Sequence, residues 1–309
     1  MAIPVILDTD IGSDVDDALA LALLLATPEV ELLGVCTVYG DVACRARIAQ
    51  KLLRLAGRAD IPVFPGAGRP LSLDRAVWWG GHEGEGLLEG DEWQEPVRED
   101  HAVDWMIDMI MARPGEITLV TIGPMTNVAL ALLREPRLAQ NVKAIVSMGG
   151  VARITDNALD LPVAEHNIRC DPEAARIVFE AGWSVTMIGL DVTMRVLITR
   201  EDVKRIGAAG TPFHAALERL IERWFQFVRR DWTALHDPLA VATALGKPFV
   251  TCQSLRVDVE TEGRITDGAT VVRRPSAELP ANAQVALAVE ADAFVRYYVD
   301  QVSGFRPGA

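Results

Sequence analysis

The chain has 309 residues, half of them hydrophobic, and its 30 basic and 43 acidic residues give a net charge of −13. This length suits one large α/β unit, so we expect a single domain over residues 1–309. An acidic chain repels phosphate backbones, which argues against a nucleic-acid partner. The sequence has no run of 18 uninterrupted apolar residues, so no membrane span is expected.

Apolar runs of strand length alternate along the chain with segments of helical period. Strands are predicted at 3–10, 30–40, 116–123, 142–150 and 184–192, and helices at 16–26, 46–57, 124–136 and 171–182. The pattern becomes helical over about 199–247, and two or three strands and a last helix follow over about 250–303. This alternation predicts an open, mostly parallel, doubly wound α/β sheet flanked by helices.

The four cysteines are far apart in the sequence and form no CxxC pair. We therefore expect free thiols and no zinc site. The first residues, MAIPVILDTD, have neither the basic start nor the long apolar stretch of a signal peptide. Together these features favour a reducing, cytoplasmic location.

The first predicted strand runs into DTDIGSDVDDALAL (8–21), which holds five aspartates between Asp8 and Asp17. Ligands of doubly wound sheets bind at the carboxyl ends of strands, where this segment lies. Neighbouring carboxylates raise one another's pKa, so a divalent cation, a hydroxyl-rich ligand or solvent must offset their repulsion. Hard oxygen ligands favour calcium or magnesium. Asp237, beside His236 at the head of a predicted helix, offers a further carboxylate.

Several kinds of protein carry acidic loops. A solvated loop that caps a helix is the simplest alternative. An EF-hand is excluded because its twelfth position would be Leu19. A haloacid-dehalogenase-like phosphatase also opens with a D-x-D strand end, and it remains an alternative although the expected threonine and lysine are not in place.

The chain resembles the nucleoside hydrolases of the inosine–uridine-preferring ribohydrolase family. The matching segments occur in the family's order and cover nearly the whole chain: DTDIGSDVDDALAL, GGHEGEGL, TLVTIGPMTNVA, SMGG, VAEHNIRCDPEAA, VTMIGLDVT and HDPLAV. The resemblance implies an open α/β fold, one bound calcium ion (Ca²⁺) and hydrolysis of the N-glycosidic bond of ribonucleosides. It also implies a homodimer or homotetramer.

Site residues follow from the resemblance position by position. The resemblance assigns calcium binding to Asp10, Asp17, Asp237 and the backbone carbonyl of Ile122. It assigns ribose binding to Asp16, Glu165 and Asn167. It also implies two active-site histidines near the sugar and the base, His82, which is counted as a substrate ligand, and His236.

Three positions depart from the family's pattern. The first loop is longer than in the best-known members, which leaves Asp14 without a role. Asp41 stands where many members carry asparagine, and it is assigned to substrate binding as an acceptor, with a place in the calcium shell as the alternative. Asn157 is the candidate ribose ligand of the loop 151–163, although it has no secure alignment.

Cleavage of the C1′–N bond passes through an oxocarbenium-like ribosyl cation. We expect Asp10 to take the proton of the attacking water and His236 to protonate the leaving base. A non-catalytic nucleoside-binding protein, the remaining alternative, would not need this acid–base set.

The segment RWFQFVRRDW (223–232) brings aromatic rings close to His236 in the sequence. Bases stack on such rings. Trp224 and Phe227 are three residues apart, which is typical of core packing on a helix, so Trp232 is predicted to contact the base.

Overall fold

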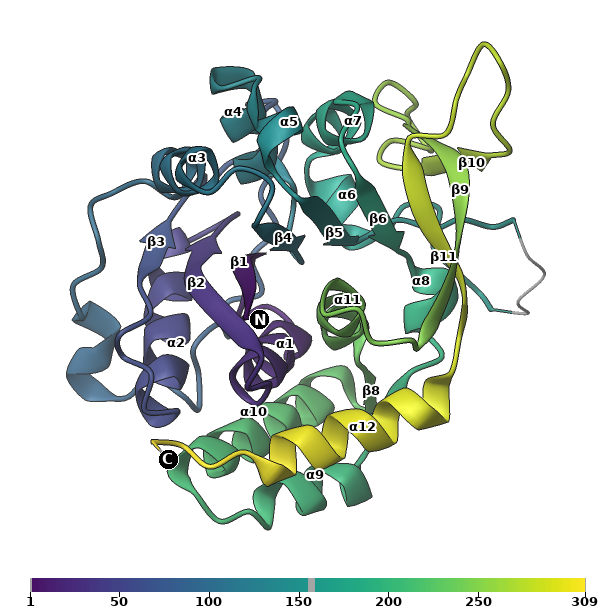
Figure 1. Ribbon diagram of the computed structural model, residues 1–309. Helices are drawn as coiled ribbons and strands as arrows, with labels where there is room; N and C mark the ends of the chain where they lie inside the picture. The colour runs from purple at the N-terminus through teal and green to yellow at the C-terminus, as the bar shows by residue number, and fades with distance from the viewer. Residues whose placement is uncertain (1, 155–158, 309) are drawn as a thin grey trace.

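The computed structural model describes residues 2–154 and 159–308 (Figure 1). Its strands are β1 (Ile3–Thr9), β2 (Val30–Thr37), β3 (Val63–Pro65), β4 (Thr118–Thr121), β5 (Ala144–Met148), β6 (Val185–Ile188), β7 (Leu197–Thr199), β8 (Trp232–Ala234), β9 (Val250–Val259), β10 (Thr270–Arg273) and β11 (Ala283–Val289). Its helices are α1 (Asp16–Leu25), α2 (Val42–Leu55), α3 (Ala102–Ala112), α4 (Thr126–Arg134), α5 (Leu138–Asn141), α6 (His166–Cys170), α7 (Pro172–Glu180), α8 (Leu190–Thr193), α9 (Arg200–Gly207), α10 (Pro212–Val228), α11 (His236–Ala244) and α12 (Ala291–Gly304), and a 3-10 helix η1 spans Gly90–Gln94.

A nine-stranded sheet forms the centre of the molecule, in the order β10-β9-β11-β6-β5-β4-β1-β2-β3. The strands from β11 to β3 pair in parallel, and β9 and β10 add an antiparallel edge. The prediction of an open, mostly parallel α/β sheet is confirmed. In register, Asp8 of β1 pairs with Thr121 of β4, which pairs with Ser147 of β5. The carboxyl ends of these strands therefore lie side by side at one end of the sheet.

Helices cover both faces of this sheet (Figure 1). Side chains of β1 alternate between two cores, as expected for an extended strand. Val5 and Leu7 belong to the core shared with α1, α2, α10, α11 and α12, whereas Ile6 belongs to the core shared with α3, α4 and α7. The fold is thus a three-layer arrangement in which the helices cover the faces of the sheet and leave the strand ends accessible.

Helix α1 lies deep in the first core because nearly all of DDALALALLL is apolar and buried. It packs along α11, and the two helices begin side by side. Their first turns carry the acidic residues Asp16, Asp17 and Asp237. Packing of two apolar helices thereby brings acids together that are more than 200 positions apart in the sequence.

Two regions differ from the prediction. The segment expected to be helical over about 199–247 contains α9, α10 and α11, but the strand β8 interrupts it and pairs with β7. Residues 58–115, for which no element was predicted, hold β3, η1 and α3. The expected strands and last helix of the end region are present as β9, β10, β11 and α12.

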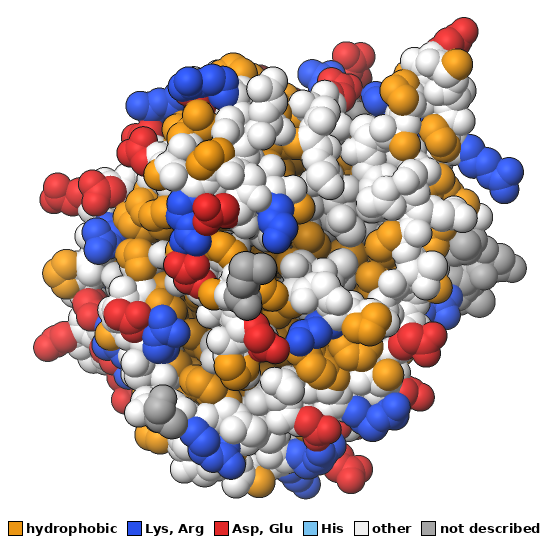
Figure 2. Space-filling view, viewed as in Figure 1, with side chains coloured by type: hydrophobic (Ala, Val, Ile, Leu, Met, Phe, Trp, Pro, Cys, Tyr) orange, Lys and Arg blue, Asp and Glu red, His pale blue; other side chains and the backbone are white. Residues whose placement is uncertain are grey.

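Basic and acidic side chains are interspersed on the face of the molecule drawn in Figure 2. Within the described residues, none of the helices combines the length and apolar character needed to cross a bilayer.

Asn127, at the start of α4, joins the strand ends through its fully buried side chain. Its amide nitrogen donates to Asp8 Oδ1 at 2.7 Å and to the carbonyl of Thr37 at 3.1 Å, and its oxygen accepts from the Ala67 amide at 2.8 Å. Burial raises the pKa of Asp8 to about 7, although the bond from Asn127 opposes this shift. One amide therefore satisfies three groups beneath the acidic loop.

Replacing Asn127 with alanine should lower the free energy of unfolding by about 2–5 kcal/mol, because the buried Asp8 carboxylate loses its strongest hydrogen bond and the Ala67 amide loses its acceptor. Urea unfolding followed by circular dichroism measures the change. Gln140→Ala, at an exposed position of α5, is the control and should change stability by less than about 0.5 kcal/mol. Equal midpoints for the two variants would contradict this role.

Candidate active site

Four aspartates converge just beyond the carboxyl end of β1. Asp10 follows the strand directly, Asp16 and Asp17 open α1, and Asp237 lies in the first turn of α11. Each is at most 5% exposed. The helix N-termini favour negative charge at three of these positions. The Thr9 hydroxyl donates to Asp17, and the Asp237 amide donates to Asp16 at 3.4 Å.

The donor set of this cluster fits a hard divalent cation. Carboxylate oxygens of Asp16, Asp17 and Asp237 all lie within 4.8 Å of one another. Asp10 lies outside this group of three but lines the same cavity, as does Ile122. The Ile122 carbonyl accepts from the Asn167 side chain at 2.9 Å and keeps a second lone pair for another partner.

Burial raises the pKa of Asp16, Asp17 and Asp237 well above the usual range, and repulsion between the carboxylates raises it further. Arg45 opposes the shift at Asp17. Its guanidinium, however, donates to the backbone carbonyls of Asp10 and Ile11 rather than to a carboxylate. The cluster consequently holds more negative charge than its protein neighbours balance, and a cation would remove the repulsion.

A cavity of about 330 Å³ opens over these aspartates. Glu165 and Asn167 line it from the start of α6. The Glu165 carboxylate caps that helix by accepting from Asn167 and Ile168 and also accepts from Gly150, at 2.8–3.1 Å. Burial raises its pKa, which these bonds oppose. The Asn167 nitrogen is engaged by carbonyls, so its oxygen is the atom available to a hydroxyl ligand.

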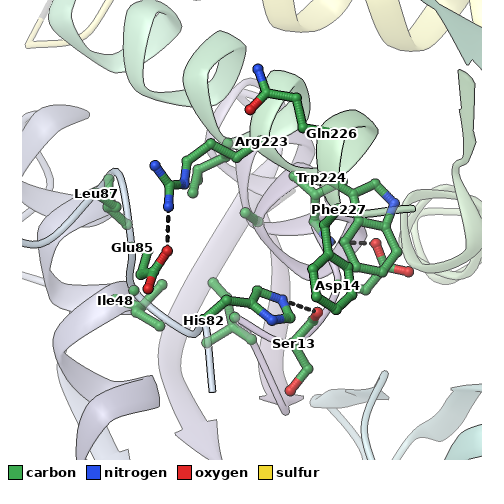
Figure 3. Close-up of a pocket in the computed structure, with 16 residues that line it drawn as sticks. Ser13, Asp14, Ile48, His82, Glu85, Leu87, Arg223, Trp224, Gln226 and Phe227 are labelled. Carbon is green, nitrogen blue, oxygen red and sulfur yellow. Dashed lines mark hydrogen bonds and ion pairs between the residues drawn. The ribbon is translucent and has the colours of Figure 1, made fainter. Parts of the chain in front are cut away.

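A second cavity of about 340 Å³ adjoins the first and shares Ser13, Asp14 and Trp224 with it. Figure 3 shows that His82, Trp224 and Phe227 face one another here beside Asp14. The ring centroids of His82 and Phe227 are 4.2 Å apart, and Trp224 stacks on Phe227 at 5.7 Å. An ion pair between Arg223 of α10 and Glu85 closes one side. The acidic cavity thus continues into an aromatic one.

The two histidines predicted at the active site have different surroundings. His236 lines the acidic cavity, and its Nδ1 lies 2.7 Å from the Thr193 hydroxyl. Burial lowers the pKa of His236 to about 4, so its imidazole is neutral near pH 7. His82 lines the aromatic cavity, and its Nε2 lies 2.9 Å from the carbonyl of Ser13. A carbonyl only accepts, so Nε2 carries the proton.

Asp14 has no counterpart in the alignment made from the sequence, yet it lines both cavities. Burial raises its pKa to about 7, and repulsion from Asp17 adds to the shift. When ionised, it therefore adds to the repulsion within the loop.

Two predicted substrate ligands lie elsewhere. Trp232 belongs to β8, under the guanidinium of Arg230, and lies outside the linings of both cavities. The chain leaves α10 through a left-handed Arg229, with φ of 55°, which directs Trp232 into the small ribbon. Trp224 and Phe227 line the cavity instead. The assignment to the core was wrong for Phe227, which is 54% exposed, whereas Trp224 also packs against the first core.

Asp41 is exposed and accepts from the Cys44 amide at 2.9 Å, as the N-cap of α2. Asp41 lies outside the linings of both cavities, and an aspartate preceding a helix satisfies the free amides of the first turn, so its role at the site stays a prediction. Asn157 lies outside the described residues. Glu83 and Arg45, which hold the loops of the site, are not among the predicted residues. A charged residue in a glycine-rich or apolar segment is the signal that could have identified them.

Comparisons with known proteins agree with this geometry. The family described as "Inosine-uridine preferring nucleoside hydrolase" matches residues 5–296. The chain is 38% identical to the pyrimidine-specific ribonucleoside hydrolase RihA of Shewanella sp. (strain ANA-3), over 99% of this chain and 98% of that relative. It is 37% identical to the inosine-uridine preferring nucleoside hydrolase of Leishmania major, over 93% of each.

Solved structures show the same likeness. The purine-preferring ribonucleoside hydrolase from Gardnerella vaginalis superposes with a TM-score of 0.87 at 31% identity, over 98% of both chains. The fold and site define an enzyme that acts on N-glycosyl bonds. The chain belongs to the inosine-uridine preferring nucleoside hydrolase family. The phosphatase and the non-catalytic binding protein are thereby set aside as alternatives.

The raised carboxyl pKa values predict how stability depends on pH. The folded protein binds these protons more tightly than the unfolded chain does, so stability falls as pH rises through the folded pKa, about 7 for Asp14. Chelator-treated protein should lose roughly 5 °C of melting temperature between about pH 5.5 and pH 8.5. Calcium should restore it at the higher pH. Differential scanning calorimetry measures both effects, and Asp14→Asn should show a smaller loss. A melting temperature that rises over this range without a cation would be the contrary result.

Proposed function

We propose that this enzyme hydrolyses the N-glycosidic bond of ribonucleosides, giving free base and ribose, and that it depends on calcium. The main support for the proposal is that the acidic cavity and the aromatic cavity adjoin each other at the strand ends. One is lined by buried carboxylates that suit a cation and ribose hydroxyls, and the other is lined by aromatic rings that suit a base.

Asp10, Asp17, Asp237 and the Ile122 carbonyl would hold the calcium, and their common position on one cavity supports this assignment. When bound, the ion would supply Lewis acidity that makes a water molecule more nucleophilic. Asp16 lies within reach of the same oxygens and is proposed to face the ribose. Calcium suits the irregular, oxygen-only donor set better than magnesium does.

The chain's own groups would perform the remaining steps. The Asp10 carboxylate is the proposed general base that removes the proton of the attacking water. Asp16, Glu165 and Asn167 would hold the ribose hydroxyls. The surrounding negative charge would stabilise the ribosyl cation as the bond to the base breaks. Binding energy from the sugar thus serves the transition state.

Trp224, Phe227 and His82 would enclose the leaving base by stacking. The relatives differ in the bases that their names give, since one is pyrimidine-specific and another is purine-preferring. A panel of purine and pyrimidine ribonucleosides, with released ribose as the readout, tests the function and assigns the base preference. We further propose a homodimer or homotetramer in the cytoplasm; light scattering measures the oligomeric state.

Asp10→Ala should abolish ribose release, because the variant loses the proposed base and a proposed cation ligand. The fold should persist, since removing one of several repelling carboxylates costs little. Steady-state ribose assays with calcium present, together with circular dichroism, measure both. Asp108→Ala, at an exposed position of α3, is the matched control and should retain full activity. Near-normal turnover of Asp10→Ala would place the base elsewhere.

His236 is the proposed proton donor to the leaving base. Its ring is neutral near pH 7 and can donate a hydrogen bond from Nε2–H when the Thr193 hydroxyl donates to Nδ1. Transfer of a proton to the base would require that the ring first take one up and act as the imidazolium. His236→Ala should therefore slow natural nucleosides by about 10²–10⁴-fold, the usual contribution of general acid catalysis. It should spare p-nitrophenyl riboside, whose leaving group needs no proton.

Comparison of the two substrates in each variant isolates this role of His236. His101→Ala, at the exposed start of α3, is the control and should leave both rates unchanged. An equal loss on both substrates for His236→Ala would make His236 a positional residue.

A further inference from the structure

A buried glutamate joins the two loops that enclose the site. Glu83 is only 3% exposed, although it lies in the glycine-rich segment 80–86. Its Oε1 accepts from the Gly80 amide at 2.7 Å and from the Ser13 hydroxyl at 3.2 Å, and its Oε2 accepts from the Gly81 amide at 2.7 Å. One carboxylate thus binds its own loop and the aspartate loop together.

The aspartate loop is held from the other side by Arg45, which is completely buried on α2. Arg45 donates to the Ser13 hydroxyl at 3.0 Å and to the Ile11 carbonyl at 3.0 Å. Its guanidinium also lies 4.9 Å from the centroid of the Trp79 ring. The positive charge of Arg45 and the negative charge of Glu83 therefore meet on one serine hydroxyl, which suits burial of both.

This arrangement determines where His82 lies. Its Nε2–H donates to the carbonyl of Ser13, and its ring packs on Phe227. The loop is folded so tightly that a Cβ on Gly80 would stand 2.6 Å and 2.7 Å from atoms of the His82 ring. The conformation of 80–81, which Glu83 fixes through two amides, is consequently the one that aims His82 into the aromatic cavity.

We propose that Glu83 is a positioning residue for catalysis, which acts by holding His82 against the aspartate loop. A carboxylate is required because every partner is a donor, and the amide of glutamine would turn an N–H toward one of them. The proposal rests on the proposed ribonucleoside hydrolase function, since it is through that reaction that the position of His82 matters.

The test is a double-mutant cycle on natural ribonucleosides with Glu83→Gln, His82→Ala and the two combined. Glu83→Gln should lower kcat/KM by about 10–100-fold, the loss expected from displaced groups and weakened charged hydrogen bonds. In the His82→Ala background it should lower kcat/KM by no more than about 3-fold, since the residue that it positions is already gone. Glu99→Gln, an exposed glutamate beyond the loop, is the matched control and should keep full activity.

Hydrogen exchange at the Gly80 and Gly81 amides gives a readout that does not depend on activity. Both amides should exchange faster in Glu83→Gln than in the wild type at equal melting temperature. Should Glu83→Gln fail to fold, Ser13→Ala, which removes only the shared hydroxyl, should show the same pattern to a smaller degree.

The outcomes separate the two proposals. The role of Glu83 would be overturned if Glu83→Gln lowered kcat/KM by the same factor with and without His82. It would also be overturned if the Gly80 and Gly81 amides exchanged at the wild-type rate in Glu83→Gln. Absence of ribose release by the wild-type enzyme would instead overturn the proposed function, while the exchange experiment would still decide whether Glu83 holds the loop.

Discussion

Electrostatic repulsion among buried carboxylates is the constraint around which this structure is built. Asp10, Asp16, Asp17 and Asp237 are all nearly inaccessible, and burial and mutual repulsion raise the pKa of the last three. Such a cluster costs folding free energy unless protons, a cation or a ligand compensate it. The fold supplies the position through the parallel strand ends and the paired helices α1 and α11. The fold does not itself compensate the repulsion between the aspartates, which a bound cation or ligand would do.

A network of polar side chains beneath the cluster keeps its geometry fixed. Asn127 satisfies Asp8 and two backbone groups below the strand ends, and Arg45 satisfies the carbonyls of the aspartate loop. Glu83 extends the same network to the loop that carries His82. These side chains hold the loops without neutralising the acids, because their bonds go mainly to backbone atoms. Rigid support of this kind keeps the carboxyl groups aimed at the cavity, where a cation would take the place of their protons.

The fold and the acidic half of the site could be predicted from the sequence because both depend on local patterns. Buried strands read as apolar runs, and an aspartate directly after such a run lies at a strand end. The aromatic half could not be predicted. Trp224 and Phe227 have core-like spacing, and the pattern does not reveal that their side of α10 faces a cavity. Trp232 and Asp41 lie outside the linings of both cavities. A left-handed turn and a helix cap place them there, and both depend on backbone geometry. Glu83 was missed because its partners are backbone amides and a hydroxyl from another loop.

The most direct test of the account is titration of calcium into chelator-treated protein by isothermal calorimetry. The account predicts one calcium per chain, with protons released at pH 6 to 7 because the raised carboxyl pKa values leave protons for the ion to displace. Asp17→Asn should weaken binding strongly, whereas Asp108→Asn, on the surface of α3, should not. Absence of binding at millimolar calcium, or equal affinity in wild type and Asp17→Asn, would contradict the claim that the buried aspartates form a cation site.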